Sequence, residues 1–163
     1  MIIKLKNKDT LLYDDFIFRC SIGKKGVKKN KIEGDKTTPK GTFALGNVYY
    51  RADRIKKPET SLPTKIIKKK IGWGNDIRNK FYNTEIKIRK NLKHEKLFRN
   101  DHKYDIFLVI KYNYTKKIFG AGSAIFIHIT KNYKPTAGCI ALNKKDFLIL
   151  LKLINIKTKI KIY

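Results

Sequence analysis

The chain is 163 residues long and carries 39 Lys and Arg against 13 Asp and Glu, which gives a net charge of +26. This length fits one domain, residues 1–163, and a hydrophobic content of 42% is enough for a packed core and excludes global disorder. No apolar run approaches the roughly 18–20 residues of a membrane-spanning helix. Two cysteines exclude a disulfide-stapled scaffold, and no Cys/His spacing is typical of a zinc site.

The basic excess consists of 33 Lys and only 6 Arg. A chain this basic attracts polyanions such as nucleic acid, anionic lipid or an acidic cell-wall polymer. Proteins that read bases rely on Arg, whose guanidinium group pairs bidentately with guanine. We therefore expect non-specific contact with polyanions at most, and no specific nucleic-acid partner.

Hydrophobic residues in the first third of the chain alternate with a period of two, which is typical of strands. Ile3 and Leu5 alternate with lysines, and residues 16–22 place two phenylalanines, Cys20 and Ile22 on one face. Residues 41–50 form a further candidate strand. Residues 51–101 have no clear period, so we predict a long loop-rich middle segment there, which is more often functional than idle.

Two strands are predicted after the middle segment. Residues 106–110 are all apolar, which is typical of a strand that is buried on both faces. Residues 124–130 alternate strictly, with isoleucines 125, 127 and 129 on one face and Phe126 and His128 on the other. If the isoleucines face the core, His128 points to the opposite side of the sheet.

One helix is predicted, near the C-terminus. Asn143 is a suitable N-cap, Asp146 lies in the first turn, and residues 147–154 supply an apolar body. Residues 156–162 alternate Ile or Thr with Lys and predict a last amphipathic strand with lysines on one side. The fold class is therefore mainly β and mainly antiparallel, with one helix.

Cys139 is the first candidate for chemistry, because it directly follows Gly138. Glycine allows a sharp turn, and main-chain amides at such a turn can stabilise an oxyanion. The alternative is a small buried hydrophobic residue, as most free cysteines are. Cys20 shares its face with phenylalanines, so we predict that it is a core residue.

His128 lies eleven residues before Cys139. A neutral imidazole within reach of a thiol can accept its proton and activate the sulfur as a nucleophile. The alternative is a histidine with an ordinary structural role. His94 and His102 have charged neighbours in the sequence and are expected at the surface or at the edge of a site.

The ten residues 34–43, GDKTTPKGTF, resemble the G-D-x-x-T-P-x-G-x-F motif of L,D-transpeptidase catalytic domains, the YkuD-like family. His128 and the later Thr136-Ala137-Gly138-Cys139 resemble the second family signature, a histidine followed by Ser/Thr-x-Gly-Cys. Three further fragments are similar to the L,D-peptidoglycan transpeptidase branch: 50–54, 94–99 and 122–126. The resemblance extends from about residue 23 to residue 153.

The resemblance implies a YkuD-like antiparallel β-sandwich with the helix beside the active site. It implies Cys139 as nucleophile, His128 as base and later acid, Gly138 as the residue that shapes the turn, and Thr136 at the substrate. The thiol would attack a peptidoglycan tetrapeptide stem before its terminal D-residue, release D-alanine and leave a thioester for an acceptor amine. Water in place of the amine would make the protein an L,D-carboxypeptidase. No cofactor or metal is needed, and we expect a monomer.

The chain departs from the family pattern at two positions beside the cysteine. Many members carry His or Asn before the glycine and Asn or Arg two residues after the cysteine, where this chain has Ala137 and Ala141. A main-chain carbonyl can orient the histidine instead. Other residues would then have to bind the anionic groups of the substrate, and the candidates are Arg51, Arg54 and Arg99. Structural ion pairs are the alternative role of these arginines.

A second function remains open at the level of sequence, a basic binding module of the same fold for cell-wall polymer or nucleic acid, without catalysis. The two alanines favour it, whereas an intact thiol and imidazole favour the enzyme. The first residues show no secretory signal, although the resemblance implies a cell-envelope or periplasmic location. A cytoplasmic location is the alternative.

Overall fold

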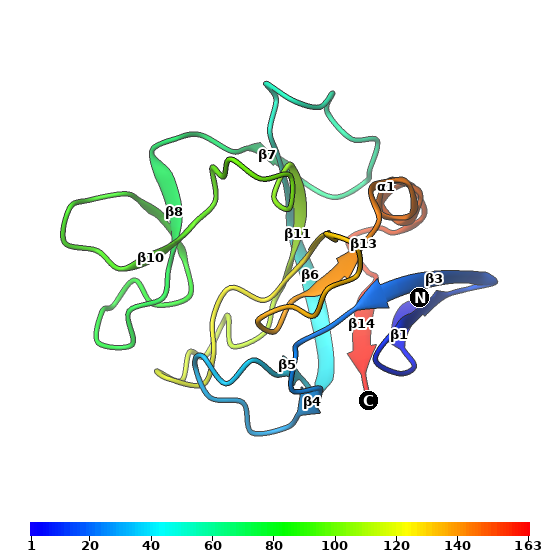
Figure 1. Ribbon diagram of the computed structural model, residues 1–163, viewed down its shortest axis with the longest axis horizontal. Coiled ribbons are helices and arrows are strands. Elements are labelled where there is room, and N and C mark those ends of the chain that lie inside the picture. The colour runs from blue at the N-terminus through cyan, green and yellow to red at the C-terminus, as the bar shows by residue number, and fades with distance from the viewer.

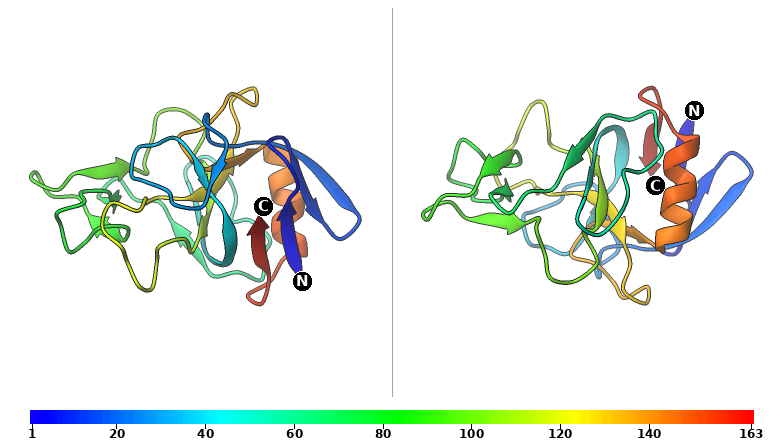
Figure 2. Two further views of the ribbon diagram at one scale, coloured as in Figure 1. Left: turned by 90° about the horizontal axis from the view of Figure 1, so that it is seen from below. Right: turned by 90° about the horizontal axis from the view of Figure 1, so that it is seen from above.

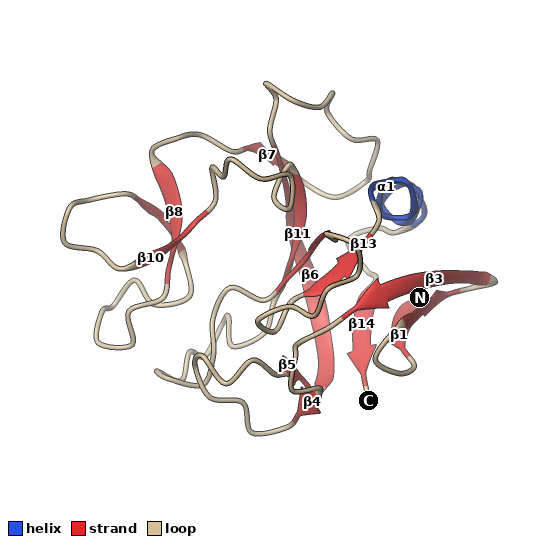
Figure 3. Ribbon diagram, in the orientation of Figure 1, coloured by secondary structure: helices blue, strands red, loops and turns tan.

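The computed structural model describes residues 1–163 and contains one helix, α1 (Lys144–Leu153), among fourteen strands. Figure 3 shows this single helix beside a fold made of strands and long loops. The strands are β1 (Ile2–Leu5), β2 (Thr10–Tyr13), β3 (Phe16–Ser21), β4 (Val27–Lys28), β5 (Thr38–Pro39), β6 (Gly41–Tyr50), β7 (Thr64–Ile66), β8 (Ile71–Gly74), β9 (Glu85–Lys87), β10 (His94–Lys96), β11 (Ile106–Ile110), β12 (Phe126–Ile129), β13 (Ile140–Leu142) and β14 (Lys159–Ile162).

The main sheet closes on itself. Its strand order is β11-β12-β13-β3-β2-β1-β14-β6-β7, and β6 also pairs with β11, so that a ring of eight strands forms a barrel-like sheet with β7 outside it. The first half of the long strand β6 pairs with β14 and its second half with β11. The plain sandwich expected from the sequence is therefore replaced by a closed sheet, in which β1–β14 and β12–β13 are parallel pairs.

The pairing of β6 with β11 closes the ring, and it is irregular. The register between them shifts between Leu108 and Ile110, as at a β-bulge, which increases local twist. A Cβ atom on Gly46 would lie only 3.0 Å from the Cβ atom of Val109, so a larger residue there would push the two strands apart by a few tenths of an ångström. Both features lie at the β6–β11 pairing, which closes the ring of strands.

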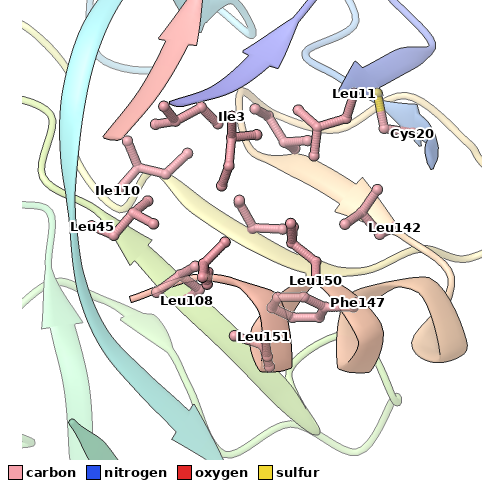
Figure 4. Packing of buried hydrophobic residues seen from close by; sticks show 14 of the residues in the cluster. Ile3, Leu11, Cys20, Leu45, Leu108, Ile110, Leu142, Phe147, Leu150 and Leu151 are labelled. Atoms are coloured by element: carbon pink, nitrogen blue, oxygen red, sulfur yellow. The ribbon is translucent and has the colours of Figure 1, made fainter. Parts of the chain in front are cut away.

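The main core fills the space between the barrel wall and α1. Alternate residues of the strands point into it, among them the isoleucines of β12, as the sequence predicted. Figure 4 shows Leu108 and Leu142 from the wall packed against Phe147, Leu150 and Leu151 of the helix. Cys20 belongs to this core, so its predicted role as a core residue is confirmed.

A second, smaller core lies on the other face of the same wall. It contains Trp73, Tyr104, Phe107, Phe126 and Cys139, together with neighbours from β6 and β11. The loop-rich middle segment covers this core and forms a small sheet of its own, in the order β10-β8-β9. In Figures 1 and 2 this small sheet lies on the opposite side of β6 and β11 from α1.

Helix α1 begins after the predicted N-cap and ends at Leu153, one residue before the end of the predicted apolar body, with Ile154 as its C-cap. The side chain of Asn143 accepts a hydrogen bond from the N–H of Asp146 at 2.9 Å, which satisfies an otherwise free donor of the first turn. The buried face consists of Phe147, Leu150 and Leu151. The one helix has only ten residues, which is too short to span a membrane.

Candidate active site

Cys139 and His128 lie on the same face of two adjacent parallel strands. In the register of β12 and β13, Ile127 is opposite Ile140 and His128 is opposite Ala141. Cys139 directly precedes β13 and receives a hydrogen bond from Phe126, which precedes Ile127. Since side chains alternate across a strand, the cysteine and histidine face the second core while the isoleucines face the first. The face predicted for His128 is thus the one it occupies.

Two cavities meet at Cys139. The larger, with a volume of about 240 Å³, is lined by Cys139, His128, Thr136 and a set of basic side chains. The smaller, of about 120 Å³, is lined by Cys139 and by the segments 31–34 and 123–125. Glu95, Tyr104 and Ala137 line both. The sulfur therefore lies where groups approaching from two directions could meet.

The thiol of Cys139 is bound to the main chain in the free protein. Its S–H donates to the carbonyl oxygen of Ala124 at 3.3 Å, and the N–H of Phe126 donates to Sγ at 3.3 Å. The residue is only 8% exposed. Burial raises the pKa of the thiol to about 12, and the Phe126 N–H opposes this only in part. At neutral pH the group is a thiol.

The imidazole of His128 is fixed by a main-chain carbonyl, as anticipated for a chain without a polar residue at position 141. Nδ1 lies 2.8 Å from the carbonyl oxygen of Ile129. A carbonyl can only accept, so Nδ1 carries the proton and Nε2 has a free lone pair. Burial lowers the pKa of His128 to about 4, and nearby Lys103 and Arg99 act in the same direction. The imidazole is therefore neutral at pH 7 and able to accept a proton.

Gly138 has a backbone conformation that other residues rarely adopt, with φ of +143°. A Cβ atom there would lie 2.7 Å from the carbonyl oxygen of Thr37. The Gly138 N–H donates to Oγ1 of Thr136 at 3.0 Å, and this hydroxyl donates to the carbonyl oxygen of Cys139 at 2.6 Å. The Thr136 side chain thus stabilises the turn by hydrogen bonds to both Gly138 and Cys139. The Gly138 N–H therefore already has a hydrogen-bond partner in the free protein.

Residues 37–39, the TTP segment of the GDKTTPKGTF motif, hydrogen-bond to this turn from a neighbouring segment of the chain. Oγ1 of Thr38 donates to the carbonyl oxygen of Gly138 at 2.9 Å and accepts from the N–H of Gly23 at 2.9 Å. Asp35 accepts hydrogen bonds from the amide and the hydroxyl of Thr37. The motif supports the cysteine turn and contributes no reacting group of its own.

A buried lysine lies behind the turn. The ammonium group of Lys31 is 2.7 Å from Oδ1 of Asp35, and its side chain passes so close to Gly122 that a Cβ atom there would lie 2.8 Å from Cε. Burial raises the pKa of Asp35, but hydrogen bonds from Ile32, Lys31 and Thr37 outweigh it and hold the pKa well below its ordinary value. Asp35 is therefore a carboxylate at neutral pH.

The three candidate arginines have different surroundings. Arg51 is buried, binds both carboxylate oxygens of Asp53 and donates to the carbonyl oxygen of Arg99. Arg54 binds Asp105 and two carbonyls and lines neither cavity at Cys139. Arg99 lines the larger cavity, although Asp101 occupies two of its donors. The structure brings only Arg99 next to Cys139 and His128.

Several residues at the site were not singled out in the sequence. Lys103 and Lys134 line the larger cavity, and Tyr104 donates to Oε1 of Glu95 at 3.1 Å between the two cavities. Glu95 lies in one of the fragments that carry the family resemblance, which was the one available signal. Lys31 lies in a lysine-rich loop, where nothing distinguishes it from a surface lysine.

His94 and His102 do not line either cavity at Cys139. His94 bonds to the carbonyl of Leu92, and His102 bonds to Asp105. No group of three or more His, Cys, Asp or Glu side chains is arranged to hold a metal ion.

Fold and site together define a β domain that presents a thiol and an imidazole to one cavity. Residues 2–162 match the model of YkuD, the L,D-transpeptidase catalytic domain. Because this match covers almost the whole chain, the protein belongs to that family, and the resemblance seen in the motifs is confirmed. Comparisons with curated proteins and with solved structures gave no match.

Proposed function

We propose that the protein is a cysteine-dependent L,D-transpeptidase that acts on peptidoglycan stem peptides through a thioester, and that it works as one domain in the cell envelope. The observation that carries the proposal is the placement of Cys139 and His128 on one face of adjacent strands, open to the same cavity. Membership of the YkuD family supports it. When water replaces the acceptor amine, the same thioester gives L,D-carboxypeptidase activity.

The proton moves together with the attack in this proposal. Cys139 is a thiol and His128 a neutral imidazole at pH 7, so no ion pair exists at rest. Nε2 accepts the thiol proton as sulfur attacks the peptide carbonyl, because the developing charges then stabilise each other. The histidine returns the proton to the amine of the departing D-residue. Rotation of the thiol away from Ala124 and Phe126 precedes this step, since neither of its present partners is the histidine.

The larger cavity suits the donor stem. Arg99, Lys103, Lys131 and Lys134 line it, against one carboxylate, Glu95. A stem peptide carries carboxylates, including that of its terminal D-residue next to the bond that breaks. Cations on the wall of a partly enclosed cavity bind such groups more strongly than they would in bulk water. Arg99 is therefore the arginine proposed to bind the substrate, because it lines this cavity and Arg51 and Arg54 do not.

The test is the intact mass of the protein after incubation with a carbapenem, followed by peptide mapping. The strained β-lactam carbonyl acylates an activated thiol without any need for the natural stem. We expect one adduct, on Cys139, in the wild type and in Cys20→Ala, and none in His128→Ala. If Cys139 takes no adduct in folded wild-type protein, the proposal fails and the basic binding module, favoured by the charge of +26, replaces it.

A further inference from the structure

A groove lies between helix α1 and the loop at residues 54–59, which run side by side in Figure 1. It has a volume of about 570 Å³ and shares no lining residue with either cavity at Cys139. Six of its eleven lining residues are Lys or Arg, against 39 of 163 in the whole chain, and Glu59 is its one carboxylate. The groove is therefore more basic than the composition of the chain accounts for.

Most cations of the groove have no counter-ion. Two of the six are paired, Arg54 with Asp105 and Lys152 with Glu59. The other four are exposed and form no ion pair: Lys56, Lys57, Lys144 and Lys145. The last two open α1, at the end where the helix dipole disfavours a cation. Like charges gathered in this way repel one another, and a bound anion would remove that repulsion.

The kind of cation and the floor of the groove indicate which anion. Five of the six basic residues are lysines, whose ammonium groups bind phosphate as point charges, whereas planar carboxylates are bound best by the fork of an arginine. The floor between the lysines is aliphatic and half-buried, with Ile55, Leu148 and Ile149. No aromatic residue lines the groove, although proteins that bind single-stranded nucleic acid stack its bases on aromatic side chains. Phosphates joined by short aliphatic spacers fit this pattern better than nucleotides.

We propose that this groove binds a linear phosphodiester polymer whose phosphates are joined by small polyols, as in poly(glycerol phosphate). The phosphates contact the unpaired lysines from the loop and from α1, and the carbon atoms of the polyol contact the aliphatic floor. This binding makes no use of Cys139 or His128. It is therefore independent of the proposed acyl transfer.

One end of the groove is connected to the larger cavity of the candidate active site. Arg54, which lines the groove, donates to the carbonyl oxygens of Asn100 and Asp101 at 3.0 and 2.9 Å. The same short segment supplies Arg99 and Lys103 to the larger cavity. A polymer in the groove therefore lies one chain segment away from the proposed donor site, and it would hold the protein at a surface that carries this polymer.

The experiment measures the binding of a fluorescent glycerol-phosphate hexamer by anisotropy, near physiological ionic strength. The groove variant combines Lys56→Gln, Lys57→Gln, Lys144→Gln and Lys145→Gln. The matched control changes four exposed lysines beside the small sheet, on the opposite side of β6 and β11 from α1: Lys68→Gln, Lys70→Gln, Lys90→Gln and Lys93→Gln.

Both variants lose four positive charges, so they lose the same non-specific attraction for a polyanion. We expect the Kd to rise about tenfold or more in the groove variant, because four weak surface charge pairs add up to that size, and to rise less than about threefold in the control. The groove variant should also show the smaller dependence of Kd on salt, since fewer counter-ions are released on binding. An equal loss in the two variants overturns the groove as the site.

Two further probes test the chemistry of the ligand, hexathymidylate and hexaglutamate. We expect both to bind the wild type more weakly than the glycerol-phosphate hexamer. If either binds as tightly and is lost in the groove variant, the groove is a site for nucleic acid or for carboxylates and the proposal is wrong. NMR titration of the wild type locates the site without any substitution: amide shifts should concentrate at residues 54–59 and 144–152, and shifts concentrated elsewhere overturn the proposal.

Carbapenem acylation separates this inference from the proposed function. The groove variant should form the Cys139 adduct as the wild type does, which shows that the variant is folded. If the wild type forms no adduct, the proposed acyl transfer fails, while the hexamer titration still decides whether the groove binds a polyol phosphate.

Discussion

The hydroxyl of Thr38 donates a hydrogen bond to the carbonyl oxygen of Gly138, 2.9 Å away and one hundred positions along the chain. The same hydroxyl accepts from the N–H of Gly23, so one buried side chain ties together three segments. The residue after Gly138 is the candidate nucleophile. A motif near the N-terminus thereby fixes the position of a sulfur near the C-terminus.

Thr38→Val should destabilise the protein and disturb the site. The change keeps the shape of the side chain but leaves the Gly138 carbonyl and the Gly23 N–H without partners, at a cost of about 1–3 kcal/mol each. Urea unfolding should show this loss, and carbapenem acylation of Cys139 should slow. Thr38→Ser keeps the hydroxyl and should behave nearly as the wild type. Equal stability of the Val and Ser variants would show that the bond contributes nothing.

Lys31→Met should reveal the coupling between Lys31 and Asp35. The lysine contacts Asp35 at 2.7 Å in a slot beside Gly122, and its removal leaves a largely buried carboxylate without its main counter-ion. We expect a loss of roughly 1–3 kcal/mol in the free energy of unfolding. The double variant Lys31→Met/Asp35→Asn should recover part of this loss, because it also removes the negative charge of Asp35, which has lost its partner. Losses that simply add in the double-mutant cycle would contradict the coupling.

The buried His128 should make the protein less stable in mild acid. Its pKa is about 4 in the folded state and 6.5 as an ordinary value, so between these pH values the unfolded chain binds a proton that the folded chain does not. Stability should therefore fall as the pH drops from about 6.5 to about 4, by on the order of 3 kcal/mol, and show no further loss from this group below that. Chemical unfolding at a series of pH values measures the slope. His128→Gln should flatten it and His94→Gln should not.

Substitution of Cys20 should affect mainly the stability of the protein, whereas substitution of Cys139 should affect its reactivity with a carbapenem. Cys20→Ala removes a sulfur from the main core and should cost about 1 kcal/mol while the carbapenem adduct still forms. Cys139→Ala should stay folded and form no adduct. Thermal unfolding measures the stability of each variant, and intact mass after incubation with a carbapenem measures adduct formation in the same samples. An adduct that persists in Cys139→Ala, or disappears in folded Cys20→Ala, would identify Cys20 as the reactive thiol.

Local pattern was sufficient to predict the elements that carry the site. The apolar run at 106–110 is β11, buried along its whole length, and the alternation at 124–130 gave both β12 and the face of His128. Asn143 marked the start of the helix. Closure of the sheet could not be predicted, because it depends on pairings of β6 with β11 and β14, which lie far apart in the chain. The short strands of the middle segment lack enough residues to show a period.

Candidate residues could be predicted from the sequence where a motif names the residue type. They could not be predicted where the role depends on the neighbours that the fold places around a side chain. Cys139 and His128 could be chosen because their spacing and the Gly138-Cys139 pair match the second family signature. The arginines could not be separated, because Arg51 and Arg99 differ only in the acceptors and cavities that the fold places around them. Lys31 could not be found at all, since burial alone distinguishes it from the other lysines.

The place of β14 in the barrel has a consequence for biosynthesis. This strand lies between β1 and β6, with Ile160 opposite Ile3 on one side and Phe43 on the other. On the ribosome, the edges of β1 and β6 that will receive it are exposed from an early stage, and they stay unpaired until residues 159–162 have left the exit tunnel. Open strand edges pair readily with other chains, so the nascent protein is most prone to aggregate during translation, whereas the finished barrel hides those edges.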